Sequence, residues 1–113
     1  MSAMVHLIQK PAGKEQVTQM LKTLENYIKV AVDIERRILA GGGVMHADCE
    51  EVLLESGCKQ KDIWGADWFP EEKRVDFRSL INIRPRQNNR VMEIQDKKIR
   101  DRVEKITKDL LQI

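Results

Sequence analysis

The sequence predicts an α+β domain with a mainly antiparallel sheet and amphipathic helices packed on one face of that sheet. Residues 28–34 and 62–84 contain apolar side chains with a period of two, which is typical of strands. Residues 14–26, 44–57 and 97–111 carry apolar side chains at helical spacing. The 113 residues suit a single domain, and the 42% of apolar residues suffices for one core.

Charge and cysteine content narrow the class of protein. The net charge is only +2, which disfavours a protein whose main task is to coat nucleic acid. No segment reaches the roughly 20 apolar residues of a membrane span, and no signal-peptide pattern begins the chain. We therefore expect a cytoplasmic location and no membrane partner. Cys49 and Cys58 form no CxxC motif, so we expect buried thiols, with a Cys49–Cys58 disulfide as the alternative.

The first half of the chain predicts a strand, a helix and a hairpin. Residues 4–8 are short and apolar and fit a strand, and an amphipathic helix follows over 14–26. Residues 28–34 alternate β-branched and other side chains, as in a strand. The chain is expected to turn near 35–37 and to return through 38–40 until three glycines end the element. A helix around the ERRILA segment is the alternative.

Two further helices have recognisable ends. The helix expected at 44–57 has Asp48, Glu50 and Glu51 crowded at its start, where the helix dipole favours acidic side chains. Gly57 is placed as the residue after the C-cap. Asp96 is a suitable N-cap for the last helix, 97–111, whose apolar stripe recurs at intervals of four, three and four.

The stretch between these helices predicts a β-hairpin and a polar loop. Residues 63–69 form the first arm, 70–73 the turn and 74–84 the second arm. A short strand at 91–94 follows the loop. The inward face of the second arm is expected to hold Val75, Phe77, Ile81 and Ile83. Its opposite face is expected to hold Arg74, Asp76, Arg78, Asn82 and Arg84, with Leu80 among them.

Five runs of sequence resemble a known family. They are VDIERRILAGGG (32–43), HADCEEVLLESG (46–57), WGADW (64–68), SLINIRPRQNNR (79–90) and MEIQD (92–96). With these runs, residues 28–112 are similar to a family of small prokaryotic proteins known only as a domain of unknown function. The resemblance implies no reaction, cofactor or substrate.

One cluster of side chains has the composition of a metal site. Carboxylates and an imidazole bind divalent metals, and the weak candidates are Asp33, Glu35, His46 and Glu50. The more economical interpretation is a solvated strand face and an acid-rich helix N-terminus. We therefore assign no metal. His46 is also the weak candidate for a catalytic residue, because histidine titrates nearest to neutral pH.

A second cluster is aromatic. Trp64 and Trp68 lie on the same side of the predicted strand, with Asp67 between them. Tryptophans in a polar hairpin can stack on a ligand ring or a base. More often they are core residues or anchors of a dimer interface.

The third cluster is the strongest candidate for a ligand site. Arginine offers a planar fork for phosphate or carboxylate, and asparagine both donates and accepts hydrogen bonds. An anion pocket is therefore predicted. The alternative is a solvated basic loop that pairs with Glu71, Glu72 or the acids of the second helix. The candidate residues of the pocket are Asn82, Arg84, Arg86, Asn88, Asn89 and Arg90.

Three functions follow as hypotheses. The first is a binding protein or enzyme for an anionic small molecule or nucleotide, which uses the Arg/Asn loop. The second is a homodimeric interaction module, which self-associates through the tryptophan hairpin. The third is an RNA- or DNA-binding module, which the low net charge disfavours. No nucleophile or cofactor motif is present, so the sequence assigns neither a reaction nor a cofactor.

Overall fold

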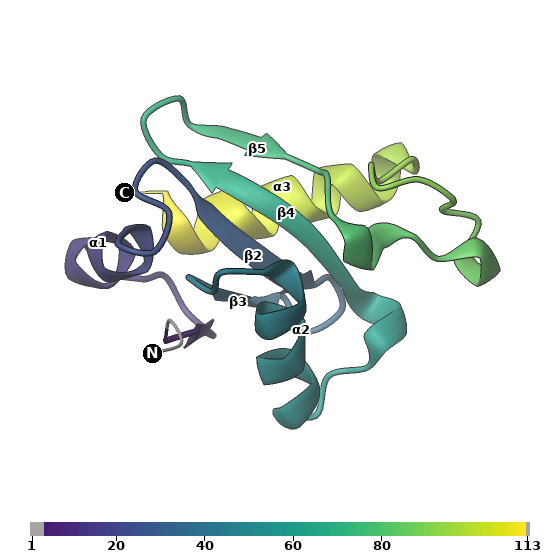
Figure 1. Ribbon diagram of the computed structural model, residues 1–113, viewed down its shortest axis with the longest axis horizontal. Helices are drawn as coiled ribbons and strands as arrows, with labels where there is room; N and C mark the ends of the chain where they lie inside the picture. The colour runs from purple at the N-terminus through teal and green to yellow at the C-terminus, as the bar shows by residue number, and fades with distance from the viewer. Residues whose placement is uncertain (1–3, 113) are drawn as a thin grey trace.

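A computed structural model describes residues 4–112, and at its centre lies a five-stranded antiparallel sheet (Figure 1). Its strand order is β1-β3-β2-β4-β5. The strands are β1 (His6–Ile8), β2 (Ile28–Asp33), β3 (Ile38–Gly41), β4 (Ile63–Phe69) and β5 (Arg74–Asp76). The α-helices of the described residues are α1 (Lys14–Leu21), α2 (His46–Glu55) and α3 (Lys97–Leu111). The α+β class is thereby confirmed.

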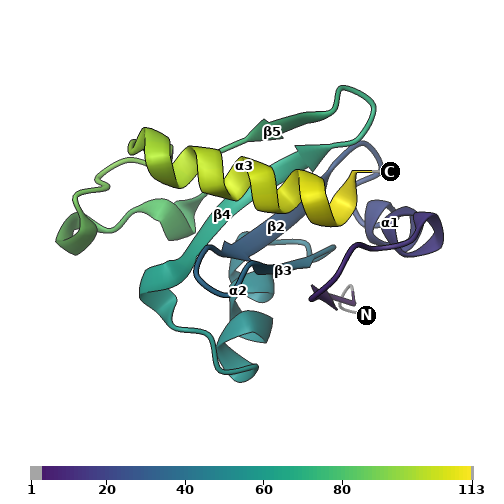
Figure 2. The same cartoon turned by 180° about the vertical axis from the view of Figure 1, so that it is seen from behind.

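Helices cover both faces of the sheet, so the expectation that they lie on one face is wrong. Helix α2 lies on the face seen in Figure 1, and α3 crosses the opposite face in Figure 2. On the α3 face, Val32 belongs to the same apolar cluster as Val103. On the other face, Ala31 is clustered with Leu53 of α2. Strand β2 is therefore buried on both faces: Ala31 and Asp33, which alternate with its valines, are fully buried.

The β2–β3 hairpin forms as predicted, and side chains explain its turn. The Oδ1 atom of Asp33 accepts hydrogen bonds from the backbone N–H groups of Glu35 (2.9 Å) and Arg36 (3.0 Å). After β3, Gly42 adopts a φ of +97°, which favours glycine. A Cβ atom at Gly42 would lie 3.1 Å from Cγ of Met20, so the glycine also admits α1 close to the sheet.

The predicted N-cap of α3 and the predicted glycine after α2 are both found. Asp96 caps α3 by accepting a hydrogen bond from the N–H of Lys98 at 2.8 Å, and Gly57 after α2 has a φ of +98°. Helix α1 is shorter than expected: it ends at Leu21, and Glu25 adopts a φ of +69°. None of the helices within residues 4–112 is long and apolar enough to cross a membrane.

The second arm of the predicted hairpin is mostly not a strand. Strand β5 pairs with β4 only over Arg74–Asp76, and short 3-10 helices follow at η2 (Leu80–Asn82) and η3 (Pro85–Gln87). The Oγ of Ser79 accepts a hydrogen bond from the N–H of Ile81 at 3.2 Å and begins the first of these turns. Ile83, expected inside, is 43% exposed. Residues 91–94 contribute only an isolated bridge, in which Glu93 pairs with Arg78.

Candidate functional site

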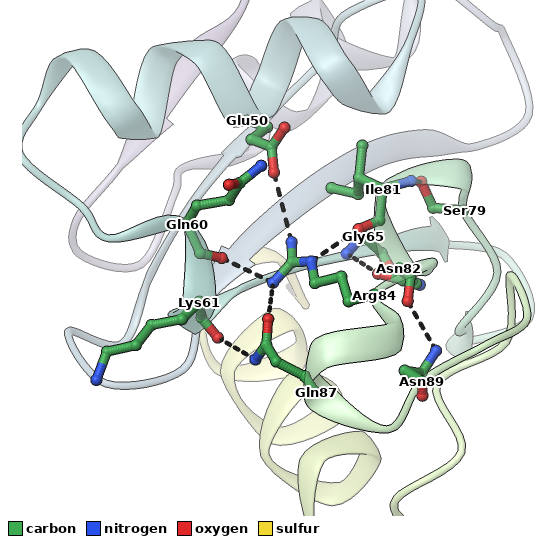
Figure 3. Close-up of polar contacts among 10 residues, drawn as sticks. All are labelled: Glu50, Gln60, Lys61, Gly65, Ser79, Ile81, Asn82, Arg84, Gln87 and Asn89. Atoms are coloured by element: carbon green, nitrogen blue, oxygen red, sulfur yellow. Dashed lines mark hydrogen bonds and ion pairs between the residues drawn. The ribbon is translucent and has the colours of Figure 1, made fainter.

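Asn82, predicted as a ligand-binding residue, is instead built into the sheet (Figure 3). Its side chain is fully buried. The Oδ1 atom accepts from the N–H of Gly65 at 2.8 Å, and Nδ2 donates to the carbonyl of Gly65 at 3.0 Å. One side-chain amide thus takes the place of a neighbouring strand at the point where β5 has already ended. The donor and acceptor groups of the Asn82 side chain therefore all point into the protein.

Asn89 organises the loop that follows. Its Nδ2 lies within hydrogen-bond distance of three backbone carbonyls, and its Oδ1 accepts from the N–H of Gln95 at 2.8 Å. One of the three carbonyls is that of Asn82, at 2.8 Å. Asn88 adopts a φ of 62°, which fits the predicted turn, and is exposed. The two buried asparagines therefore fix the loop rather than present it to a ligand.

The side chain of Arg84 links segments that are far apart in the sequence (Figure 3). It donates to the carbonyls of Ile81 (2.9 Å) and Gln60 (2.7 Å), and Nη2 lies 3.4 Å from Oε2 of Glu50. The guanidinium carbon lies 4.8 Å from the ring centroid of Trp64. Burial lowers the pKa of Arg84, and Glu50 opposes that shift. This is the alternative the sequence left open, in which the arginine pairs with an acid of the second helix.

The remaining loop arginines do not complete a pocket with Arg84. Arg86 and Arg90 are exposed, and their side chains form no ion pair or hydrogen bond with the described residues. Arg84 and Arg86 line a shallow depression of about 520 Å³ beside Glu50, and Arg90 does not line it. His46 lies in a different hollow. The three arginines therefore do not come together with His46.

The tryptophans belong to the core. Trp64 and Trp68 are each 1% exposed and lie in the cluster on the α3 face. Their rings are therefore not available for stacking on a ligand or for anchoring a dimer. The cysteines agree with the sequence: Cys49 and Cys58 are free and buried.

The weak metal candidates are dispersed. Asp33 is enclosed in the β2–β3 turn, Glu35 pairs with Arg102 at 3.3 Å, and Glu50 faces Arg84. No group of three metal-ligating side chains occurs within residues 4–112.

A cleft of about 650 Å³ lies beside the start of α2. Its walls come from β2, the N-terminus of α2, β4, and the irregular segment after β5. This volume lies within the roughly 300–1,000 Å³ typical of small-molecule sites. The cleft is lined by Tyr27, Lys29, Met45, His46, Ala47, Asp67, Asp76, Phe77, Arg78, Ser79, Leu80, Ile81, Met92 and Glu93.

An imidazole–carboxylate pair lies in this cleft. Nε2 of His46 lies 2.8 Å from Oδ1 of Asp67 and 3.0 Å from the carbonyl oxygen of Ala66. A carbonyl and a carboxylate only accept hydrogen bonds, so Nε2 must carry the proton. Nδ1 forms no hydrogen bond with the described residues and is left to accept a proton or a hydrogen bond. This is the arrangement of an oriented general base.

Sequence reasoning named His46 but did not pair it with Asp67. The signal was present in WGADW, because alternation places Asp67 on the face opposite the two tryptophans. That face is the one that α2 covers. The sequence did not indicate which helix packs on that face, because all helices were expected on a single face of the sheet.

Charged side chains complete the cleft. Lys29 stands opposite Asp67 in the β2–β4 register. Lys29 and Arg78 have no ion-pair partner among residues 4–112, whereas Asp76 is paired with Arg74. Two further acids line the cleft: Asp67, whose partner His46 is neutral as described above, and Glu93, which has no ion-pair partner among the described residues. The cleft therefore contains two cations that form no ion pair, beside the histidine and these two carboxylates.

Comparison with known proteins gives a family but no activity. No curated protein and no solved structure matches the chain. A family model described as "Protein of unknown function (DUF5674)" matches residues 6–110. This span contains the whole sheet and all but the last residue of α3, together with the cleft. The chain therefore belongs to the DUF5674 family of proteins of unknown function.

Proposed function

We propose that the protein binds a small anionic molecule in the His46 cleft. The observation that carries this proposal is the presence of two cations, Lys29 and Arg78, without ion-pair partners in a hollow that also holds the His46–Asp67 pair. An arginine fork and a lysine ammonium suit a phosphate or carboxylate group. The proposal keeps the class of ligand that the sequence indicated and moves its site away from Arg84.

His46 gives the cleft a group that can exchange a proton with the bound molecule. Its Nε2–H is held by Asp67 and Ala66, so the lone pair at Nδ1 has a fixed direction. The histidine side chain is only 10% exposed, and its carboxylate partner 16%. Electrostatic interactions are stronger in such a sheltered place than at an open surface. Apolar neighbours, among them Phe77 and Met92, would contact the remainder of the ligand.

A thermal-shift screen with inorganic phosphate, nucleoside monophosphates and small carboxylic acids tests the proposal. A ligand at a hundred times its dissociation constant stabilises the folded state by about 2.7 kcal/mol, which raises the melting temperature measurably. Replacing Lys29 or Arg78 with Gln is expected to weaken binding by about tenfold each, the effect of losing one charge-assisted hydrogen bond.

Two matched variants serve as controls. Lys59→Gln and Arg86→Gln remove exposed charges that do not line the cleft, and we expect both to bind as the wild type does. If the screen produces no stabilisation at millimolar concentration, the cleft is not an anion site. If Arg86→Gln abolishes the shift while Arg78→Gln does not, the ligand binds at the loop instead.

A further inference from the structure

A second hollow lies on the opposite side of the sheet, between the C-terminal half of α3 and the β2–β3 turn. Its volume is about 230 Å³, and it shares no lining residue with the His46 cleft. Figures 1 and 2 show that α2 and α3 lie on opposite faces, so the two hollows open on different sides of the molecule. A ligand of one hollow does not contact the other.

The floor of this slot is apolar. It is formed by Ile34, Ile106 and Leu110, whose exposed fractions are 6%, 7% and 7%. Val32, near the end of β2, and Val103, on the same helix, are completely buried. The slot is thus a place where the side chains of the core reach the surface, and Pro11 closes one side of it.

The rim of the slot is basic. Arg102 is held by the carbonyl of Ile34 at 2.6 Å and by Glu35 at 3.3 Å, and Lys105 is paired with Asp109 at 2.9 Å. Arg37 is exposed and has no ion-pair partner among residues 4–112. Its backbone is fixed at a φ of +58°, and its N–H donates to the carbonyl of Asp33 at 2.9 Å. One uncompensated cation therefore stands at the edge of an apolar floor.

We propose that this slot binds a small apolar acid, namely a single aromatic ring or short alkyl chain that carries one carboxylate. The apolar part would cover Ile34, Ile106 and Leu110, and the carboxylate would face Arg37. Size supports this class: an apolar cavity of about 150 Å³ takes up benzene, whereas drug-sized ligands need about 300 Å³ or more. The slot lies between these limits.

Methyl NMR with benzoate as the probe tests the proposal on the intact chain. We expect saturable shifts of the Ile34 and Ile106 methyl groups, while the Met45 and Met92 methyl groups report separately on any binding of benzoate in the His46 cleft. Benzyl alcohol has the same ring without the charge, so it is expected to bind about fivefold to tenfold more weakly. The substitution Arg37→Gln should weaken the binding of benzoate by a similar factor.

The controls separate this slot from the proposed function of the cleft. Arg90→Gln removes an exposed arginine that lines neither hollow, and Lys29→Gln removes a cation of the cleft. Both are expected to leave the shifts of Ile34 and Ile106 unchanged. The proposal is wrong if benzoate gives no saturable shift at these methyl groups, if benzyl alcohol binds equally well, or if Arg37→Gln has no effect.

Discussion

Arg84 shows why a polar run can suggest a ligand site and yet serve the fold. Its guanidinium joins three segments through Ile81, Gln60 and Glu50. Two of these partners are backbone carbonyls, which any residue type could supply. Composition therefore could not indicate that the hydrogen-bonding capacity of this arginine is used inside the molecule, and only the three-dimensional arrangement separates it from Arg86, which is exposed.

Replacing Arg84 with Met is expected to lower the free energy of unfolding by about 2–4 kcal/mol. The change leaves Glu50 and two carbonyls without their donor while it keeps most of the apolar stem. Urea unfolding measures the effect. Arg86→Met, at an exposed position nearby, should change stability by less than about 0.5 kcal/mol. Equal effects of the two substitutions would contradict the structural role of Arg84.

The thiol of Cys49 gives a pH dependence at the residue scale. Burial raises its pKa from 9.0 to about 11, so the native state keeps the proton after the unfolded state has lost it. The contribution of this thiol to the free energy of unfolding is therefore complete below pH 9. As the pH rises towards 11, up to about 3 kcal/mol of that free energy is lost. Denaturation of wild type and Cys49→Ala across this range checks it, because lysine and tyrosine titrations are common to both. Parallel stability curves would refute the prediction.

At the scale of elements, the hydrophobic periodicity of the sequence predicted strands and helices correctly where the backbone forms regular hydrogen-bonded structure. The β2–β3 hairpin and α3 lie where the sequence predicted them, and Asp96 caps α3 as expected. The pattern after Asp76 misled because Ser79 turns the chain and a side chain then pairs with β4. The alternation of apolar residues cannot predict that a side chain takes the place of a strand. The amide of Asn82 acts like a backbone peptide group only because the fold places it beside Gly65.

The junction of Asn82 and Gly65 can be tested by two substitutions. Asn82→Ala leaves the N–H and carbonyl of Gly65 without partners, so unfolding should become easier by about 2–4 kcal/mol. In Gly65→Ala, a Cβ atom would lie 2.6 Å from Cβ of Ser79 and would displace the same segment. Arg86→Ala, at an exposed position with an ordinary backbone, is the control for the loop. Calorimetry compares the three, and a loss below about 0.5 kcal/mol for Asn82→Ala would exclude this junction as a source of stability.

At the scale of the molecule, the two-sided packing determines which residues meet at the cleft. Helix α2 lies against small residues of the sheet such as Ala31 and Ala40, which lets its first turn bring His46 to Asp67. These two residues are 21 positions apart, and nothing in either local pattern links them. The candidate site could therefore be predicted only in part: His46 was found from its chemistry, but its partner depends on which helix covers which face.

The same packing predicts that the described fold unfolds as one unit. Trp64 and Trp68 are buried with α3 residues on one face of the sheet, and β2 and β4 supply buried side chains to both faces. Loss of either helix would expose the shared strands, so far-UV circular dichroism and tryptophan fluorescence should give the same urea midpoint. For a small domain the slope is expected to be about 1–3 kcal/mol per molar urea. Midpoints that differ beyond experimental error would show that the helices leave the sheet in separate steps.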